Sequence, residues 1–300
     1  MAVCFTKGGQ TAWFHDEGDT AGFFHTYDAM SLSGKELWPH KVHVFLPRDY
    51  EETGQRYGVL YMNDGHTVFF PGGYYYRTWN LADKLAELYC KQTLAPILVV
   101  AVCPVDRNCE YTHARWNDAA GCCRLPEYAD YLVNTLKPFI DGCYRTLPGR
   151  AMHAGASHGG LAAFYTGLRY PGIFNLVAAL SPSFWVGLDD ADDFPLVKAR
   201  PEQRLEKSAL LSDLATGLAD SRRPALYLDW GLVRGGGPHN SHIEALAAQR
   251  GREMAELLAS RHGYCSGKTL FAAEISDGDH TECSWRGRLD TALRLWPQLD

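Results

Sequence analysis

The chain has 300 residues, of which 46% are hydrophobic and 21% charged, and its formal net charge is −6 at pH 7. This composition is ordinary for a globular protein, and the acidic balance argues against a nucleic-acid partner, which would favour a basic surface. No run of about 18 apolar residues is present that could cross a membrane, so we expect no membrane partner either.

Predicted strands and helices alternate along most of the chain. Residues 41–47 alternate in polarity before a proline, as in an edge strand, and residues 96–102 form the continuous apolar run of a parallel sheet. The other predicted strands are 57–62, 150–155, 176–181, 224–229 and 270–275, and the predicted helices are 80–90, 126–143, 159–168 and 241–261. This alternation predicts an α/β fold with a central, mostly parallel sheet flanked by helices. We expect one domain over 1–300, with 187–222 as a candidate cap or insertion.

Cysteine usage favours a reducing compartment. The chain has nine cysteines, an odd number without a Cys-x-x-Cys pair, and the adjacent Cys122 and Cys123 are poorly placed to bridge each other. Mostly reduced thiols are therefore expected, with a disulfide framework or a metal site as alternatives. The N-terminal segment lacks the apolar stretch of a secretory signal, so we expect a cytoplasmic protein.

A G-x-S-x-G pattern, Gly155 to Gly159 with Ser157 at its centre, lies between a predicted strand and a predicted helix. A serine on such a sharp turn requires neighbours without a Cβ two positions away on each side. The start of the following helix would then direct backbone N–H groups at a developing oxyanion. The pattern predicts Ser157 as a nucleophile, and a structural glycine-rich turn is the alternative.

A serine hydroxyl needs a base to act as a nucleophile. In chains built around this motif, the base comes late, after the last strand. His280 is the one histidine beyond His262, and it follows the predicted strand 270–275 in a loop. We therefore predict that His280 accepts the proton of Ser157.

Further segments match a known family in order along residues 41 to 296. They are 59–66 with Phe69, 97–102 followed by Arg107, Glu110 and Tyr111, 155–160 continuing to 168–171 and Phe174, 180–185, and 278–282 with Trp285 and Arg288. With them the chain resembles the putative-esterase branch of the α/β hydrolases, which contains enterobactin-type siderophore esterases, feruloyl esterases and S-formylglutathione hydrolase. The order of the segments is far more specific than the serine motif alone.

The resemblance implies an oxyanion hole and a substrate pocket. One N–H should come from His158, directly after the nucleophile, and the other from His66 or Thr67 after the turn at 63–65. Trp185, after a predicted strand, could wall an acyl or aromatic pocket or simply pack in the core.

Glu110, together with Arg107, is a candidate for holding a polar group of the substrate. An ordinary surface ion pair is the alternative for these two residues.

The acid that orients the base, which completes a Ser–His–acid triad, is where this chain departs from the family pattern. The resemblance places an acid at or just after the strand that ends at Asp229, where relatives often carry an aspartate a few residues further on, and this chain has Arg234 there. Arg234 cannot accept a bond from an imidazole N–H. Asp229 is the nearest carboxylate and the first choice. Glu244, Asp279, Glu282 and a Ser–His pair without a carboxylate stay open.

These observations predict a serine carboxylic-ester hydrolase that works through an acyl-enzyme, without cofactor or metal. The resemblance alone implies the substrate class, a siderophore-type lactone or an aryl or feruloyl ester. The alternatives are a non-catalytic binding protein with a hydrolase fold and an acyltransferase. The sequence does not separate these, and it leaves the oligomeric state open.

Overall fold

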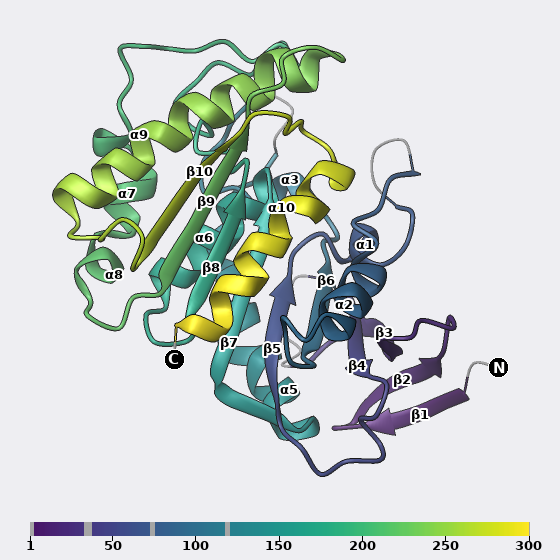
Figure 1. The fold of residues 1–300 in the computed structure, drawn as a ribbon. Coiled ribbons are helices and arrows are strands. Elements are labelled where there is room, and N and C mark those ends of the chain that lie inside the picture. The colour runs from purple at the N-terminus through teal and green to yellow at the C-terminus, as the bar shows by residue number, and fades with distance from the viewer. Residues whose placement is uncertain (1–2, 33–37, 73–75, 118–120, 300) are drawn as a thin grey trace.

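The computed structural model of the chain describes residues 3–32, 38–72, 76–117 and 121–299. Ten strands in this part of the chain form one sheet (Figure 1). The strands are β1 (Val3–Lys7), β2 (Gln10–His15), β3 (Gly22–Met30), β4 (His40–Pro47), β5 (Tyr57–Met62), β6 (Leu98–Cys103), β7 (Thr146–Ala156), β8 (Leu176–Leu180), β9 (Ala225–Gly231) and β10 (Leu270–Ile275).

The sheet has the order β1-β2-β3-β4-β6-β5-β7-β8-β9-β10. Strands β6, β5, β7, β8, β9 and β10 pair in parallel, whereas β1 to β4 pair antiparallel to one another and β4 pairs antiparallel to β6. The inner parallel strands are almost continuously apolar because helices cover both of their faces. The predicted α/β-hydrolase fold is confirmed.

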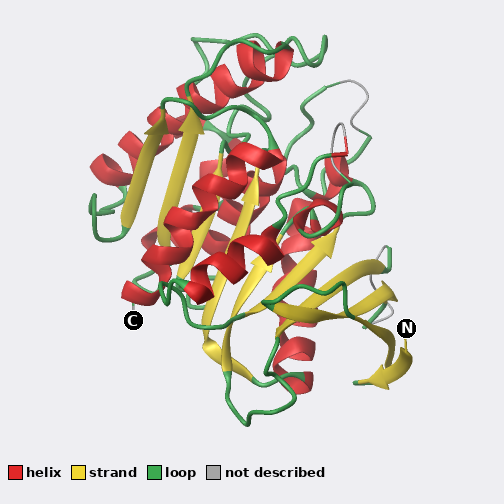
Figure 2. Ribbon diagram, turned by 45° about the vertical axis from the view of Figure 1, so that its right-hand side comes forward, coloured by secondary structure: helices red, strands yellow, loops and turns green. Residues whose placement is uncertain are grey.

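Helices pack on both faces of this sheet (Figure 2). The helices that contribute to the core on one face are α4 (Leu125–Tyr131), η2 (Leu132–Leu136), α5 (Lys137–Cys143), α6 (His158–Arg169) and α9 (Ala245–Arg261). Those on the opposite face are α1 (Gly65–Val68), α2 (Leu81–Cys90) and α10 (Glu282–Leu295). The remaining helical segments are α3 (Arg107–Glu110), η3 (Leu205–Lys207), α7 (Ala209–Asp213), α8 (Ala215–Ala219), η4 (His239–Glu244) and η5 (Trp296–Gln298).

The N-terminal strands change one expectation. Residues 41–47 are predicted as an edge strand because of Pro47, but β4 is an inner strand that pairs with both β3 and β6. The proline is tolerated because it is the last residue of the strand, where one fewer ladder hydrogen bond is needed. The edge lies instead at β1, at the purple end of the chain in Figure 1.

Residues 187–222 contain the short helices η3, α7 and α8 and one isolated bridge between Asp190 and Lys198. Their division from the rest of the chain as a cap stays a prediction, as does the single domain. Among the helices in the described ranges, none combines the length and the apolar character that a membrane crossing requires.

Candidate active site

Parallel strands bring the predicted site residues to one edge of the sheet. Strands β5 to β10 all run in one direction, so their carboxyl ends meet at the same edge, where open α/β sheets bind ligands. The residues that follow these ends are Asn63 and Asp64 after β5, Ser157 after β7, Ser181 after β8 and His280 in the loop beyond β10. This edge therefore gathers side chains from distant parts of the sequence.

Ser157 occupies the sharp turn between β7 and α6. Its backbone has φ 57° and ψ −123°, a conformation that a residue with a side chain rarely adopts. A Cβ at Gly155 would collide with the carbonyl oxygen of Gly159, and a Cβ at Gly159 would lie 2.7 Å from Asp64 Oδ2. Both glycines of the motif are thus required by close approach, as the sequence pattern predicted.

Ser157, His280 and Glu244 form a continuous hydrogen-bonded chain. Ser157 Oγ lies 3.1 Å from His280 Nε2, and the other ring nitrogen, Nδ1, lies 2.5 Å from Glu244 Oε2. All three side chains are buried. If Nδ1–H donates to the carboxylate, Nε2 is left as the acceptor for the serine proton, which is the geometry that a general base needs.

Asp229, the expected acid, does not contact the imidazole. Its Oδ2 accepts the Tyr227 hydroxyl at 3.0 Å, and its Oδ1 lies 3.3 Å from Arg288 Nη1. Asp229 is still within β9, and its side chain points to other partners, whereas Glu244 reaches His280 from the first turns of the helix that follows. Of the carboxylates that the sequence left open, Glu244 and not Asp229 lies within hydrogen-bond distance of His280.

The Glu244 carboxylate is held at its other oxygen as well. Oε1 accepts the Ser181 hydroxyl at 2.8 Å and the backbone N–H of Gly231. Burial by itself would raise the pKa of Glu244, but the hydrogen bond to His280 and the charge of Arg288 hold it below its ordinary value. Glu244 is therefore an anion fixed by at least three donors, which suits the stabilisation of an imidazolium.

The other candidate acids have separate partners. Asp279 Oδ1 accepts the Thr281 hydroxyl at 2.5 Å, and Glu282 lines the pocket at the start of α10. Arg234, which stands where relatives often carry an acid, donates to the carbonyl groups of Gly231 and Val233. Its guanidinium thus supports the loop after β9.

The π-helix η4 explains why the sequence did not single out Glu244. The expected helix 241–261 begins earlier, at His239, and its first turns are wound as a π-helix, a form often found at functional sites. Asn240 in the same segment accepts the backbone N–H of His280 at 2.8 Å. One signal was available: Glu244 is a charged residue beside Ile243, on the apolar side of the expected helix.

The two residues expected to bind an oxyanion, His158 and His66, each lie in the first turn of a helix and line the same cavity as Ser157. His158 is the first residue of α6 and His66 the second of α1, so neither N–H has an acceptor within its own helix. The N–H of Thr67 already donates to Asp64 O at 2.8 Å. Of the two residues expected to supply the second donor, His66 is therefore available and Thr67 is not.

A cavity of about 760 Å³ opens above Ser157, within the range of small-molecule sites. Trp185 belongs to its wall, as do His66 and Thr67. Successive aromatic contacts follow this wall: Trp185–Trp116 at 5.7 Å between ring centroids, Trp116–Phe194 at 5.2 Å, Phe194–His239 at 6.2 Å and His239–His280 at 6.2 Å. We call these five rings the aromatic wall; it leads from the core to the base.

Glu110 does not belong to the pocket. It is 3% exposed, lies 3.2 Å from His40 Nε2, and accepts the backbone N–H of Val105 at 3.3 Å. The expected partner Arg107 forms instead a two-pronged ion pair with Asp64, with N–O distances of 2.7 and 3.0 Å. Glu110 therefore stabilises the loop after β6, and Arg107 alone of the two faces the cavity.

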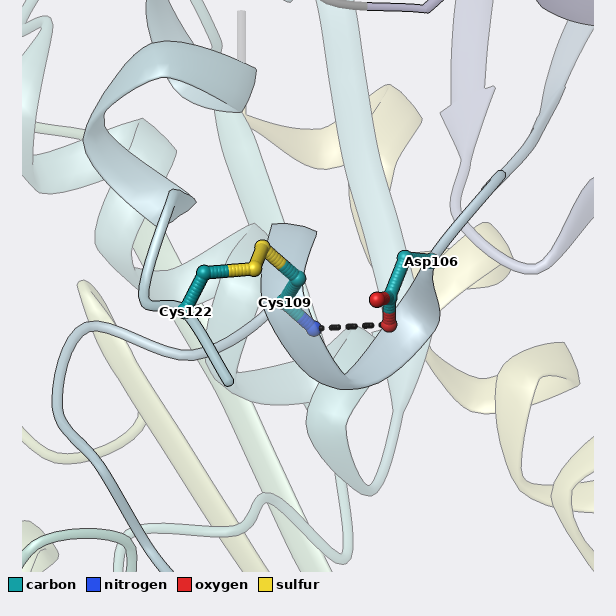
Figure 3. Close-up of side chains that lie close together, drawn as sticks. All are labelled: Asp106, Cys109 and Cys122. Carbon is teal, nitrogen blue, oxygen red and sulfur yellow. Dashed lines mark hydrogen bonds between the residues drawn. A yellow bond between two sulfur atoms is a disulfide. The ribbon is translucent and has the colours of Figure 1, made fainter. Parts of the chain in front are cut away.

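One pair of cysteines forms a disulfide, whereas the sequence predicts mostly reduced thiols. Cys109 and Cys122 are bonded, with Asp106 beside them (Figure 3). Among the described residues these three are the one group of His, Cys, Asp and Glu close enough to hold a metal ion, but the disulfide uses both sulfurs and Asp106 Oδ1 accepts the N–H of Cys109. The bond closes the loop that carries Trp116 of the aromatic wall.

Replacing Cys109 and Cys122 together by serine should lower the free energy of unfolding by about 3 kcal/mol, because a loop of this length loses much entropy when it is cross-linked. Guanidinium unfolding of the oxidised protein measures the difference. The matched control is serine at the exposed free cysteines Cys90 and Cys265, with an expected change within about 0.5 kcal/mol. Equal stability of both double variants would show that the bond contributes nothing.

Comparison with known proteins places this site in a family. The family model described as "Putative esterase" matches residues 35–295. An uncharacterised protein of Bacillus subtilis (strain 168), YbbA, is 26% identical over 165 residues, which cover 52% of this chain and 61% of that protein. The match thus spans less than two thirds of that relative.

Several solved structures have a fold similar to that of this chain. The enterobactin esterase FES from Shigella flexneri with enterobactin has a TM-score of 0.62 at 20% identity, covering 92% of this chain and 59% of that one. The siderophore hydrolase EstA from Aspergillus nidulans has 0.61 at 18%, covering 89% and 94%, and a ferulic acid esterase has 0.58 at 19%, covering 87% and 93%. Since the family model covers most of the chain, the protein belongs to the putative esterase family of hydrolases.

Proposed function

We propose that the protein hydrolyses carboxylic esters through an acyl-enzyme on Ser157. Ser157 Oγ attacks the ester carbonyl carbon while His280 Nε2 takes its proton, and the amides of His158 and His66 bind the oxyanion. Collapse of this intermediate breaks the bond to the alcohol, which leaves with the proton from His280. Water then attacks the acyl-enzyme, His280 again takes and returns a proton, and the carboxylic acid is released. Glu244 supports the imidazolium in both steps.

The observation that carries this proposal is the buried chain of contacts from Glu244 through His280 to Ser157. A protein that only binds ligands has no need of a strained serine with an aligned base and acid. The experiment that tests it is labelling with a fluorophosphonate, followed by mass spectrometry of the modified peptide. We expect one label, on Ser157, and free acid as the product from a simple ester without any acceptor alcohol. A labelled enzyme that needs an added alcohol would be an acyltransferase, and an unlabelled Ser157 would favour a binding protein.

The aromatic wall supports an ester with an aromatic ring as the substrate. Rings in offset or edge-to-face contact gain about 0.5–1.5 kcal/mol beyond their buried area, and the wall offers such contacts from Trp185 to His239 beside the nucleophile. The names of the structural relatives, a ferulic acid esterase and an enterobactin esterase, point the same way. We therefore propose aryl or feruloyl esters, or a siderophore-type lactone that bears aromatic groups.

Phe194 offers a test of this substrate class that spares the fold. It is 42% exposed and lies between Trp116 and His239 in the aromatic wall. In Phe194→Ala, kcat/KM for 4-nitrophenyl benzoate should fall about 3- to 10-fold, the equivalent of one ring contact. The value for 4-nitrophenyl acetate, which shares the leaving group, should change less than twofold.

The matched control for Phe194→Ala is Leu196→Ala. Leu196 is 44% exposed on the same segment but does not line the cavity. It should leave the ratio of the two kcat/KM values unchanged. An equal loss for both substrates in Phe194→Ala would mean that the ring does not contact the acyl group.

A further inference from the structure

We propose that Asp229, although it does not touch the imidazole, acts with Arg288 as a pair of positioning residues. Together they set how strongly the triad acid Glu244 stabilises the protonated imidazole of His280. This inference rests on the proposed function of the same site. Asp229 and Arg288 would determine how much of the Glu244 charge is available to the imidazolium that forms on His280. Asp229 thus has a role in catalysis through Arg288, in place of the direct role expected from its sequence position.

Three charged groups of alternating sign and the imidazole of His280 lie in series in the interior. Asp229 Oδ1 is 3.3 Å from Arg288 Nη1, the same nitrogen is 3.7 Å from Glu244 Oε1, and Glu244 Oε2 is 2.5 Å from His280 Nδ1. Asp229 and Glu244 are fully buried, and Arg288 is 5% exposed. Water screens charges little at such sites, so each charge acts strongly on the next.

The guanidinium of Arg288 is shared between two carboxylates that compete for it. While Asp229 is ionised, it balances Arg288, and the charge of Glu244 is left for the imidazolium. Once Asp229 takes up a proton, Arg288 is balanced by Glu244 alone, and the imidazolium loses part of its support. A buried carboxylate without a charge partner is costly, which explains why a cation stands between two anions here.

Ser181 links this pair to the triad through hydrogen bonds. Its Oγ accepts Arg288 Nη2 at 2.8 Å and Trp285 Nε1 at 3.3 Å, and donates to Glu244 Oε1 at 2.8 Å. One donor and two acceptor positions are all that a hydroxyl has, so each is used. The Ser181 N–H donates to Asp229 O at 2.8 Å. Movement of Arg288 would therefore be passed to Glu244.

Protonation of Asp229 falls in a range that an assay can reach. Burial raises the pKa of its carboxyl to about 6, although Arg288 and the Tyr227 hydroxyl favour the ionised form. The groups that face Asp229 are Tyr227 on β9, Arg288 on α10 and Glu244 on η4.

Two further imidazoles face His280, His158 from α6 and His239 from η4. Burial lowers the pKa of both. The wild type and all the variants of the test keep both imidazoles, so a shift of the pH profile between variants reports on Asp229 and Arg288.

The test is the acidic limb of the pH profile for fluorophosphonate labelling of Ser157, which needs no knowledge of the substrate. Asp229→Asn removes a negative charge, so the imidazolium is less favoured and the limb should move to lower pH, by roughly half to one unit. Arg288→Gln removes a positive charge, and the limb should move to higher pH. The double variant should return it close to the wild-type position.

Tyr227→Phe is a second variant that tests the proposal even if Arg288→Gln folds poorly. It keeps both charges but removes a bond that favours ionised Asp229, so the limb should move in the same direction as in Asp229→Asn, by less. Asp189→Asn is the matched control, because Asp189 forms a buried ion pair with Arg250 at 2.7 Å outside the pocket. It should lower stability and leave the limb in place.

The outcomes separate this inference from the proposed function. If Ser157 is not labelled in the wild type, the proposed function fails. If Ser157 is labelled in every variant, but Asp229→Asn and Arg288→Gln move the limb in the same direction or not at all, the function stands and Asp229 and Arg288 are structural only. Opposite shifts that cancel in the double variant support the inference.

Discussion

Ser157→Ala is expected to lower kcat/KM for 4-nitrophenyl esters about 10⁴-fold or more. Without the hydroxyl no acyl-enzyme can form, and only the oxyanion donors and the binding pocket remain to promote attack by water. The fold should survive, because alanine is smaller than serine and the strained turn is held by Gly155 and Gly159 on either side. Circular dichroism and steady-state rates on the same sample measure both.

Ser183→Ala is the control that decides which hydroxyl reacts. Ser183 Oγ lies 3.4 Å from Ser157 Oγ and 2.8 Å from His158 Nδ1, so it is a second buried hydroxyl at the same place. Among the described residues, no hydrogen bond joins Ser183 to His280. Loss of its hydroxyl should therefore lower kcat/KM less than about tenfold. A loss in Ser183→Ala as large as in Ser157→Ala would contradict the assignment of the nucleophile.

Local chemistry explains why the fold and two members of the triad could be found in the sequence. A strained serine needs glycines at fixed spacing, and apolar strands alternating with helices leave a periodic pattern. Both signals are local, and the structure follows them for Ser157, for His280 and for the parallel strands. The family resemblance supplied the position of the oxyanion loop, and the family is confirmed.

Contacts between distant segments explain what the sequence did not reveal. Asp229 lies within β9 and Glu244 in the helix that follows it, and both carboxylates are buried. The choice between them depends on which one His280 contacts, and Glu244 lies 36 residues before it in the chain. The sequence predicts that Glu110, beside Arg107, could bind a substrate group. In the fold it contacts His40, which lies 70 residues away in the chain. Tertiary partners decide such pairings, so residue type and spacing alone leave them open.

Glu244→Gln should have the second largest effect, a fall in kcat/KM of about 10³- to 10⁴-fold. A glutamine fits the same space, but its amide N–H would face His280 Nδ1, so the ring would carry its proton on Nε2 and could not accept one from Ser157. Asp229→Asn should cost less than about tenfold at the pH optimum. Rates of both variants with one ester, at several pH values, measure the contrast.

Glu282→Gln is the matched control for Glu244→Gln, because Glu282 lines the same cavity but contacts neither ring nitrogen of His280. It should remain within a few fold of the wild type. The reverse ranking, with Asp229→Asn near 10⁴-fold and Glu244→Gln near normal, would restore Asp229 as the acid. A small effect of both would instead show that Ser157 and His280 work as a pair. The structure favours the first ranking, because a carboxylate 2.5 Å from Nδ1 fixes the tautomer on which the base depends.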